Sequence, residues 1–203
     1  MNPFELYIYE SMAEAIRSLP LDDTPDIYAL SFYIDAEEDD PRAMTLTFSY
    51  NTNERWRACT PTPSRKPGWP IASDAEEAKW NYAFWLQNDV RGVGNSGHLQ
   101  DAEGILLRHE WLMDQDLYYT DEEEESEFES TLEKGEEIIH RFVEMCIRVS
   151  RRLHDEGILR SKFRRDVPIL VHELEYDEQI ADWTRQANPP RLTQEFEEWI
   201  ASL

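Results

Sequence analysis

The chain of 203 residues predicts an α+β fold, with a single domain over residues 1–203. Three observations carry this prediction. An unbroken apolar stripe from about Thr131 to Glu156 indicates one long helix in the C-terminal half. Residues 44–50 alternate between apolar and polar side chains, as a half-buried strand does. Strand patterns near both ends, without regular βαβ alternation, favour a mainly antiparallel sheet of about four strands packed by helices.

The first elements are a helix and two strands. Asn2 can cap a helix that Pro20 ends. Residues 26–35 are rich in aromatic and β-branched side chains, so they are expected to form the first strand, followed by the strand over 44–50. A short third strand is expected around 56–59. The apolar stripe of the first helix comprises Phe4, Ile8, Met12, Ala15, Ile16 and Leu19.

Two helices are expected in the middle of the chain. Ser73 and Glu76 form a capping box, which predicts a helix that runs to about Gln87. A further helix is expected over residues 101–117. Its periodic positions are Ala102, Ile105, Leu106, His109, Leu112 and Met113.

The last elements begin with the long helix, which should end before Gly157 because glycine accepts the left-handed conformation there. A strand is expected over 167–176, and short helices are expected to begin at Asp177 and Thr193. The predicted core face of the long helix, packed against the sheet, comprises Ile139, Phe142, Val143, Cys146, Val149, Ser150 and Leu153.

The overall charge excludes several classes of partner. The chain carries 43 acidic and 20 basic residues, for a formal net charge of −23. We therefore expect neither nucleic acid nor an anionic membrane as a partner, since both need a basic surface. No basic leader and no apolar run of about 20 residues is apparent, and two cysteines form no disulfide framework, so a cytoplasmic location is expected.

The acidic residues concentrate in two segments. Residues 121–129 hold seven acids in nine positions. Such a run is either a solvated helix entrance or a face that attracts a basic protein. The candidate partner-binding residues are Asp121, Glu122, Glu123, Glu124, Glu125 and Glu127, together with Glu37, Glu38, Asp39 and Asp40.

Two motifs raise an alternative function. The segment Gly92–Gly97 matches the G-x-G-x-x-G pattern, but a dinucleotide site needs a strand before it and a helix after it, so a loop is favoured. His172, Glu173 and Glu175 fall on the expected strand over 167–176. There, the two carboxylates would share one face about 6–7 Å apart, within the range of glycosidase acid pairs, while His172 would face the core. A small-ligand-binding or nucleotide-binding protein, or a hydrolase, remains the alternative.

Parts of the chain resemble a known family. The segments are the helix Ala75–Trp85, the stretch Val167–Ile180 that ends near Ala187-Asn188-Pro189, and the strand Ile27–Leu30. Together they resemble the bacterial domain of unknown function family 4303. That family has no assigned activity, so the resemblance implies no catalytic, cofactor-binding or metal-binding residue.

The preferred interpretation is a cytoplasmic acidic binding protein. Small acidic bacterial proteins of this type often act as immunity proteins against secreted toxins, which is an analogy and not a motif match. The expected partner is a basic protein, such as a toxin domain, that is blocked sterically and electrostatically. No cofactor is expected, and the oligomeric state is left open.

Overall fold

The computed structural model describes residues 2–22, 24–62 and 70–203. Four strands form one sheet in the order β3-β2-β1-β4. β2 is antiparallel to both of its neighbours, whereas β4 runs parallel to β1. The α+β fold with a mainly antiparallel sheet is confirmed. The strands are β1 (Ile27–Ala36), β2 (Met44–Thr52), β3 (Arg91–Val93) and β4 (Ile169–His172).

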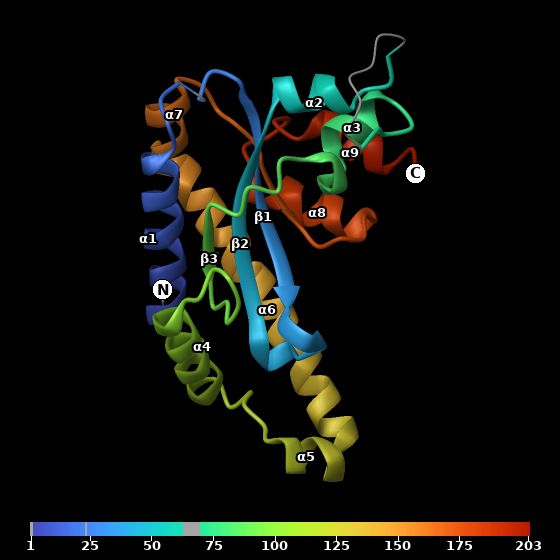
Figure 1. Cartoon of the computed structure of the whole chain (residues 1–203). Helices are drawn as coiled ribbons and strands as arrows, with labels where there is room; N and C mark the ends of the chain where they lie inside the picture. Colours follow the sequence, from blue (N-terminus) through green and yellow to red (C-terminus); the bar gives the residue numbers. More distant parts are fainter. Residues whose placement is uncertain (1, 23, 63–69) are drawn as a thin grey trace.

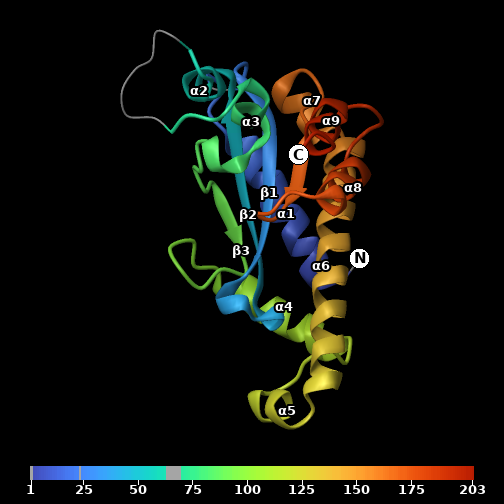
Figure 2. The ribbon, with the colours of Figure 1, turned by 90° about the vertical axis from the view of Figure 1, so that its right-hand side faces the viewer.

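Helices pack around this sheet (Figures 1 and 2). They are α1 (Pro3–Ser18), α2 (Asn53–Cys59), α3 (Ala75–Trp80), α4 (Ala102–Asp114), α5 (Asp121–Ser126), α6 (Phe128–Asp155), α7 (Ile158–Phe163), α8 (Glu178–Ala187) and α9 (Gln194–Ile200), with 3₁₀ turns η1 (Glu37–Asp39), η2 (Pro41–Ala43) and η3 (Tyr82–Phe84). Among the described residues, none of these helices combines the length and apolar character that crossing a membrane requires.

The main core lies between one sheet face and the helices α1 and α6. Leu30, Phe32 and Ile34 alternate along β1 and point into it. The predicted stripe of α1 is buried throughout. The stripe of α6 is also buried, except that Ile139 is half-buried and Ile138 takes the interior position. Gly157 follows α6 with φ +71°, the left-handed conformation that its sequence position predicted.

The opposite sheet face is covered over only part of its length. A second core cluster packs aromatic side chains of α3, η3 and α9 against Ala29 of β1 and Leu170 of β4. The remaining length of this face carries Tyr33 and Asp35 of β1, next to residues of β2. This partial cover leaves a groove on the sheet surface.

Two expected elements in the first half of the chain were wrong. The short strand around 56–59 is helix α2, because the Thr52 side chain caps it by accepting from the Arg55 N–H at 3.1 Å. The helix expected over 73–87 ends at Trp80. It is capped by Asp74 and not by Ser73, and Asn81 then leaves the helical conformation and caps η3.

Two later expectations also need correction. The strand over 167–176 stops at His172, where its pairing with Tyr33 ends. The helix over 101–117 exists as α4, but of its expected apolar face only Leu112 is buried. Leu106 and Met113 are exposed, and the buried face comprises Gly104, Arg108, Trp111 and Leu112.

Candidate functional site

The two acidic segments predicted from the sequence meet at one end of the molecule. The segment 37–40 forms the turn between β1 and β2, and 121–127 forms helix α5 and the residue after it (Figure 1). Arg42 joins them. Its guanidinium pairs with Asp40 at 2.9 Å and with Asp121 at 2.8 Å, and lies 3.5 Å from Glu124. We call the residues 37–40 and 121–127 the acidic end.

Arg42 is held firmly in this position. Its side chain is only 16% exposed, its Nη1 donates to the Tyr119 carbonyl at 3.0 Å, and its guanidinium lies 4.7 Å from the Tyr119 ring centre. The neighbouring carboxylates raise the pKa of Arg42 well above its ordinary value, with the Asp40 hydrogen bond as the largest cause. A permanently charged arginine therefore fixes α5 beside the β1–β2 turn.

Helix α5 begins with a capping box. The Thr120 hydroxyl accepts from the Glu123 N–H at 3.2 Å, and the Glu123 carboxylate accepts from the Thr120 N–H at 2.8 Å. Four acids occupy the first turn, where the helix dipole favours negative charge. Every residue from Asp121 to Ser130 is exposed. The acidic side chains of this helix are therefore exposed to solvent.

An exposed apolar pair lies next to this acidic helix. Phe128 and Leu132 are 65% and 51% exposed, and they are one turn apart at the start of α6. The same helix stripe continues to Ile139, which is half-buried. The sequence prediction missed this pair, because it began the helix at about Thr131, after Phe128, and began the apolar face only at Ile139. Large apolar residues surrounded by charged ones are typical of protein interfaces.

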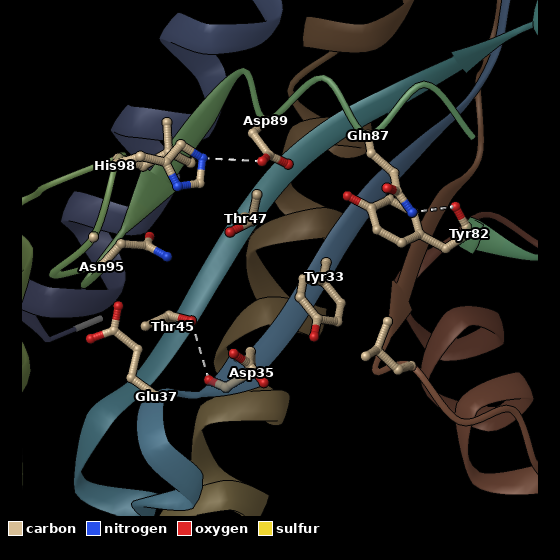
Figure 3. A pocket seen from close by; sticks show the side chains of 13 residues that line it. Tyr33, Asp35, Glu37, Thr45, Thr47, Tyr82, Gln87, Asp89, Asn95 and His98 are labelled. Carbon is tan, nitrogen blue, oxygen red and sulfur yellow. Dashed lines mark hydrogen bonds and ion pairs between the residues drawn. The ribbon is translucent and has the colours of Figure 1, made fainter. Parts of the chain in front are cut away.

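A groove crosses the uncovered part of the sheet (Figure 3). Its volume is about 350 Å³. Tyr33 of β1 stacks on Tyr82 of η3, with ring centres 5.6 Å apart and planes 14° apart. The lining residues are Tyr33, Asp35, Glu37, Thr45, Thr47, Tyr82, Gln87, Asp89, Asn95, Gly97, His98, Leu99 and Leu174. We call this the sheet groove, and through Glu37 it adjoins the acidic end.

The charges of the sheet groove are negative. Asp35, Glu37 and Asp89 line it, and no lysine or arginine of the described residues does. Among the lining residues, His98 lies 3.1 Å from Asp89. Burial, together with Asp35, raises the pKa of Tyr33 to about 12, so its hydroxyl stays neutral.

His172, Glu173 and Glu175 do not form the arrangement that the alternative function required. His172 is fully buried, where its Nε2 lies 2.7 Å from the Ser31 hydroxyl and its Nδ1 lies 2.8 Å from the Glu173 carbonyl. Burial lowers the pKa of His172 to about 4, so the imidazole is neutral near pH 7. β4 ends before Glu173, so the two glutamates do not share a strand face. No substrate reaches Ser31 or His172 in this structure, since both are 0% exposed.

The Gly92–Gly97 segment is built as a structural turn. Gly92 lies in β3, and Gly94 has φ +77°. The Gly94 N–H donates to Asp101 at 3.0 Å, and the Ser96 N–H donates to Glu37 at 2.8 Å. Carboxylates thus occupy two of the backbone donors that a phosphate would use. Helix α4 begins only at Ala102, so these amides are not at its N-terminus.

Comparisons with known proteins add nothing to these observations. No family model, no curated protein and no solved structure matches this chain. Within the described residues, no group of three or more His, Cys, Asp or Glu side chains is placed to hold a metal ion. The resemblance to the bacterial domain of unknown function family 4303 therefore stays a prediction, and the geometry of the acidic end and the sheet groove has to carry the functional argument.

Proposed function

We propose that this chain is an acidic binding protein that neutralises a basic bacterial toxin in the cytoplasm by covering the toxin's active cleft. The observation that carries the proposal is the meeting of two acidic segments, distant in sequence, on either side of Arg42. The exposed pair Phe128 and Leu132 follows the second of these segments directly, at the start of α6. Apolar anchors would supply affinity, and the neighbouring charge would select a basic partner and speed its approach.

The small-ligand alternative has weaker support. The buried His172, the separated glutamates and the carboxylate-filled turn at Gly94 give it no assembled site. A negatively lined groove also repels phosphates and other anions. No specific observation favours a hydrolase, so the binding function is the one we propose.

Growth rescue tests this proposal. Each protein encoded beside the gene for this chain is expressed alone in a bacterial host, and any that arrests growth is then co-expressed with this chain. We expect one basic neighbour to be toxic and to be neutralised. The proposal is rejected if no basic neighbour is toxic, or if co-expression leaves the arrest unchanged although the chain is folded and abundant.

A variant locates the binding surface in the same assay. Five substitutions, Asp121→Asn and Gln at Glu122, Glu123, Glu124 and Glu125, should weaken rescue. The matched control removes five exposed acids from other parts of the molecule, namely Glu14, Asp22, Glu54, Glu76 and Glu178. Both variants change the net charge equally, so only a local acidic surface predicts different outcomes.

A further inference from the structure

Several lysine and arginine side chains of this protein lie over an aromatic ring and also pair with a carboxylate. Lys79 lies 4.7 Å from the Trp80 ring centre and 5.1 Å from that of Trp56, and it pairs with Glu195. Cations are attracted both to the faces of such rings and to carboxylates. The arrangement therefore marks a place where a basic side chain is stable.

Two further examples follow the same pattern. Arg42 lies over Tyr119 and pairs with Asp40 and Asp121. Arg152 lies 3.7 Å from the Tyr9 ring centre and pairs with Glu156, which also accepts from the Tyr9 hydroxyl. In each of the three cases, the cation comes from this chain.

The sheet groove offers the same components. The stacked rings of Tyr33 and Tyr82 form one wall, and Asp35, Glu37 and Asp89 supply carboxylates around it (Figure 3). Among the described residues, the partners shown for these two carboxylates are hydrogen-bond donors and not cations: the Ser96 N–H donates to Glu37 at 2.8 Å, and the Tyr33 hydroxyl donates to Asp35. A volume of about 350 Å³ is at the lower end of the range for ligand pockets, so it suits one long side chain.

The aromatic wall is held in place before any ligand arrives. The Tyr82 N–H donates to the Tyr176 hydroxyl at 2.9 Å, and the Tyr82 carbonyl accepts from Gln87 at 3.2 Å. The Tyr82 hydroxyl lies 3.4 Å from the buried Ser49 hydroxyl. A ring fixed in this way loses little freedom when a cation packs on it.

We propose that the sheet groove binds the side chain of a lysine or arginine from the basic partner. The cation would lie against the Tyr33 ring and pair with Asp35 and Glu37. This inference rests on the proposed function and adds to it a second contact, beside the acidic end, that recognises a single basic side chain. It explains why charge and aromatic rings are combined at the uncovered part of the sheet.

The test uses three small probes on the full chain, followed by amide chemical shifts in NMR spectra. The probes are the Nα-acetyl methylamides of lysine, arginine and norleucine, the last being the neutral control. We expect the two basic probes to shift the amides of Tyr33, Asp35 and His98, and we expect norleucine to leave them unchanged. Equal shifts with norleucine, or shifts confined to residues outside the groove, overturn the proposal.

Variants sharpen the result. Asp35→Asn, at an exposed position, should raise the half-saturating concentration of the lysine probe about fivefold, and Tyr33→Leu should do the same. Glu14→Gln, an exposed acid on α1, should leave it unchanged. Asp35→Asn keeps the test decisive if Tyr33→Leu fails to fold. An unchanged half-saturating concentration in Asp35→Asn overturns the proposal.

Two further measurements distinguish a protein side chain from a free polyamine as the ligand, and a failure of the groove proposal from a failure of the proposed function. Spermidine tests for a free polyamine: if it binds the groove more than tenfold more tightly than the lysine probe, the assignment to a protein side chain is wrong. The five-acid variant at 121–125 should bind the lysine probe normally. If the probe binds the groove but growth rescue fails, the proposed function fails alone. If rescue succeeds but the probe does not bind, only the groove proposal fails.

Discussion

The buried side chain of His172 contacts residues from distant parts of the chain. His172 lies among the rings of Tyr33, Tyr82 and Tyr176, with the Tyr176 ring stacked at 5.8 Å and 15°. Its two nitrogens lie within hydrogen-bonding distance of Ser31 and the Glu173 carbonyl. A neutral imidazole meets both demands, with Nδ1 donating and Nε2 accepting. His172 is thus a structural residue, as its position in the sequence pattern suggested.

His172 should make the fold sensitive to acid. Burial lowers its pKa from 6.5 to about 4. As pH falls through 6.5 the unfolded chain binds a proton, which the folded chain does not bind until about pH 4. The contribution of His172 to the free energy of unfolding is therefore fully present above pH 6.5. It falls by up to about 3 kcal/mol as the pH falls from 6.5 to 4. Urea unfolding at several pH values measures this.

The matched variant for this prediction is His172→Gln, which keeps a hydrogen-bonding side chain but does not titrate. The difference in unfolding free energy between the natural chain and the variant should shrink by about 3 kcal/mol from pH 7 to pH 4. Other titrating groups cancel in this difference. Parallel curves for the two proteins would show that His172 is not the acid-sensitive residue.

At the scale of elements, the chain has one long helix with two different ends. The C-terminal part of α6 is core, with Phe142 fully buried and 6.1 Å from the Phe4 ring. Its first turns extend past the sheet and carry the exposed Phe128. The helix meets η2 closely at Gly135, where an added Cβ would come within 3.2 Å of Pro41. The close approach brings the β1–β2 turn near α5.

The two phenylalanines of α6 should respond in opposite ways. Phe142→Ala should lower the free energy of unfolding by about 3–5 kcal/mol, because it leaves a cavity in the core. Phe128→Ala should change it by less than about 0.5 kcal/mol, since the ring is mostly solvated. It should instead speed the dissociation of the toxin found by growth rescue. Denaturant unfolding and surface-plasmon dissociation rates measure both, and a destabilised Phe128→Ala would contradict the interface assignment.

Arg42 should control the order of helix α5. With six residues, α5 is too short to be stable alone. Arg42→Ala removes the cation that ties Asp121 and Glu124 to Asp40, so amide exchange over 121–126 should become at least about tenfold faster. Arg185→Ala is the control, because Arg185 is 55% exposed in a surface ion pair. Unchanged exchange in Arg42→Ala would show that α5 is held by other contacts.

Sequence patterns predicted those elements whose period is long and regular, such as α1, β1, β2 and α6. They failed where only a few residues decide between a helix and a strand. Residues 56–59 contain a tryptophan and a cysteine, so they fit a strand as well as a helix, and only the Thr52 cap settles the choice. The candidate acids were found from composition, but Arg42, which joins them, follows no local pattern. The sheet groove likewise depends on which parts of the sheet remain uncovered.

At the scale of the whole molecule, several basic residues form ion pairs, whereas many acidic residues face solvent. Several arginines of the C-terminal half face carboxylates: Arg148 pairs with Glu5, and Arg160 pairs with Asp166. The exposed acids of 121–129 face mainly solvent, with Arg42 as the cation that contacts Asp121 and Glu124 in the described structure. The ten acids of 37–40 and 121–127 thus form a local cluster of negative charge, beside the general acidic excess that gives the chain its net charge of −23. The field of this cluster steers a basic protein toward the acidic end.

This field predicts how the toxin found by growth rescue should associate. Attraction between exposed charges is screened beyond about 8–10 Å at physiological salt, so the association rate should fall as salt rises, while the dissociation rate, set by apolar contacts, changes less. The five-acid variant at 121–125 should associate about tenfold more slowly at low salt and lose most of its salt dependence. Stopped-flow mixing measures both rates.

The control variant decides whether position or net charge is responsible. Removing five acids far from the acidic end, at Glu14, Asp22, Glu54, Glu76 and Glu178, makes the net charge less negative by the same amount but leaves the local charge of the acidic end in place. Its association rate should stay within about twofold of the natural chain, because screening limits the influence of distant charges. Equal slowing in both variants would mean that net charge alone steers the toxin. An association rate indifferent to salt and to both variants would show that the acidic end is only a solvated surface.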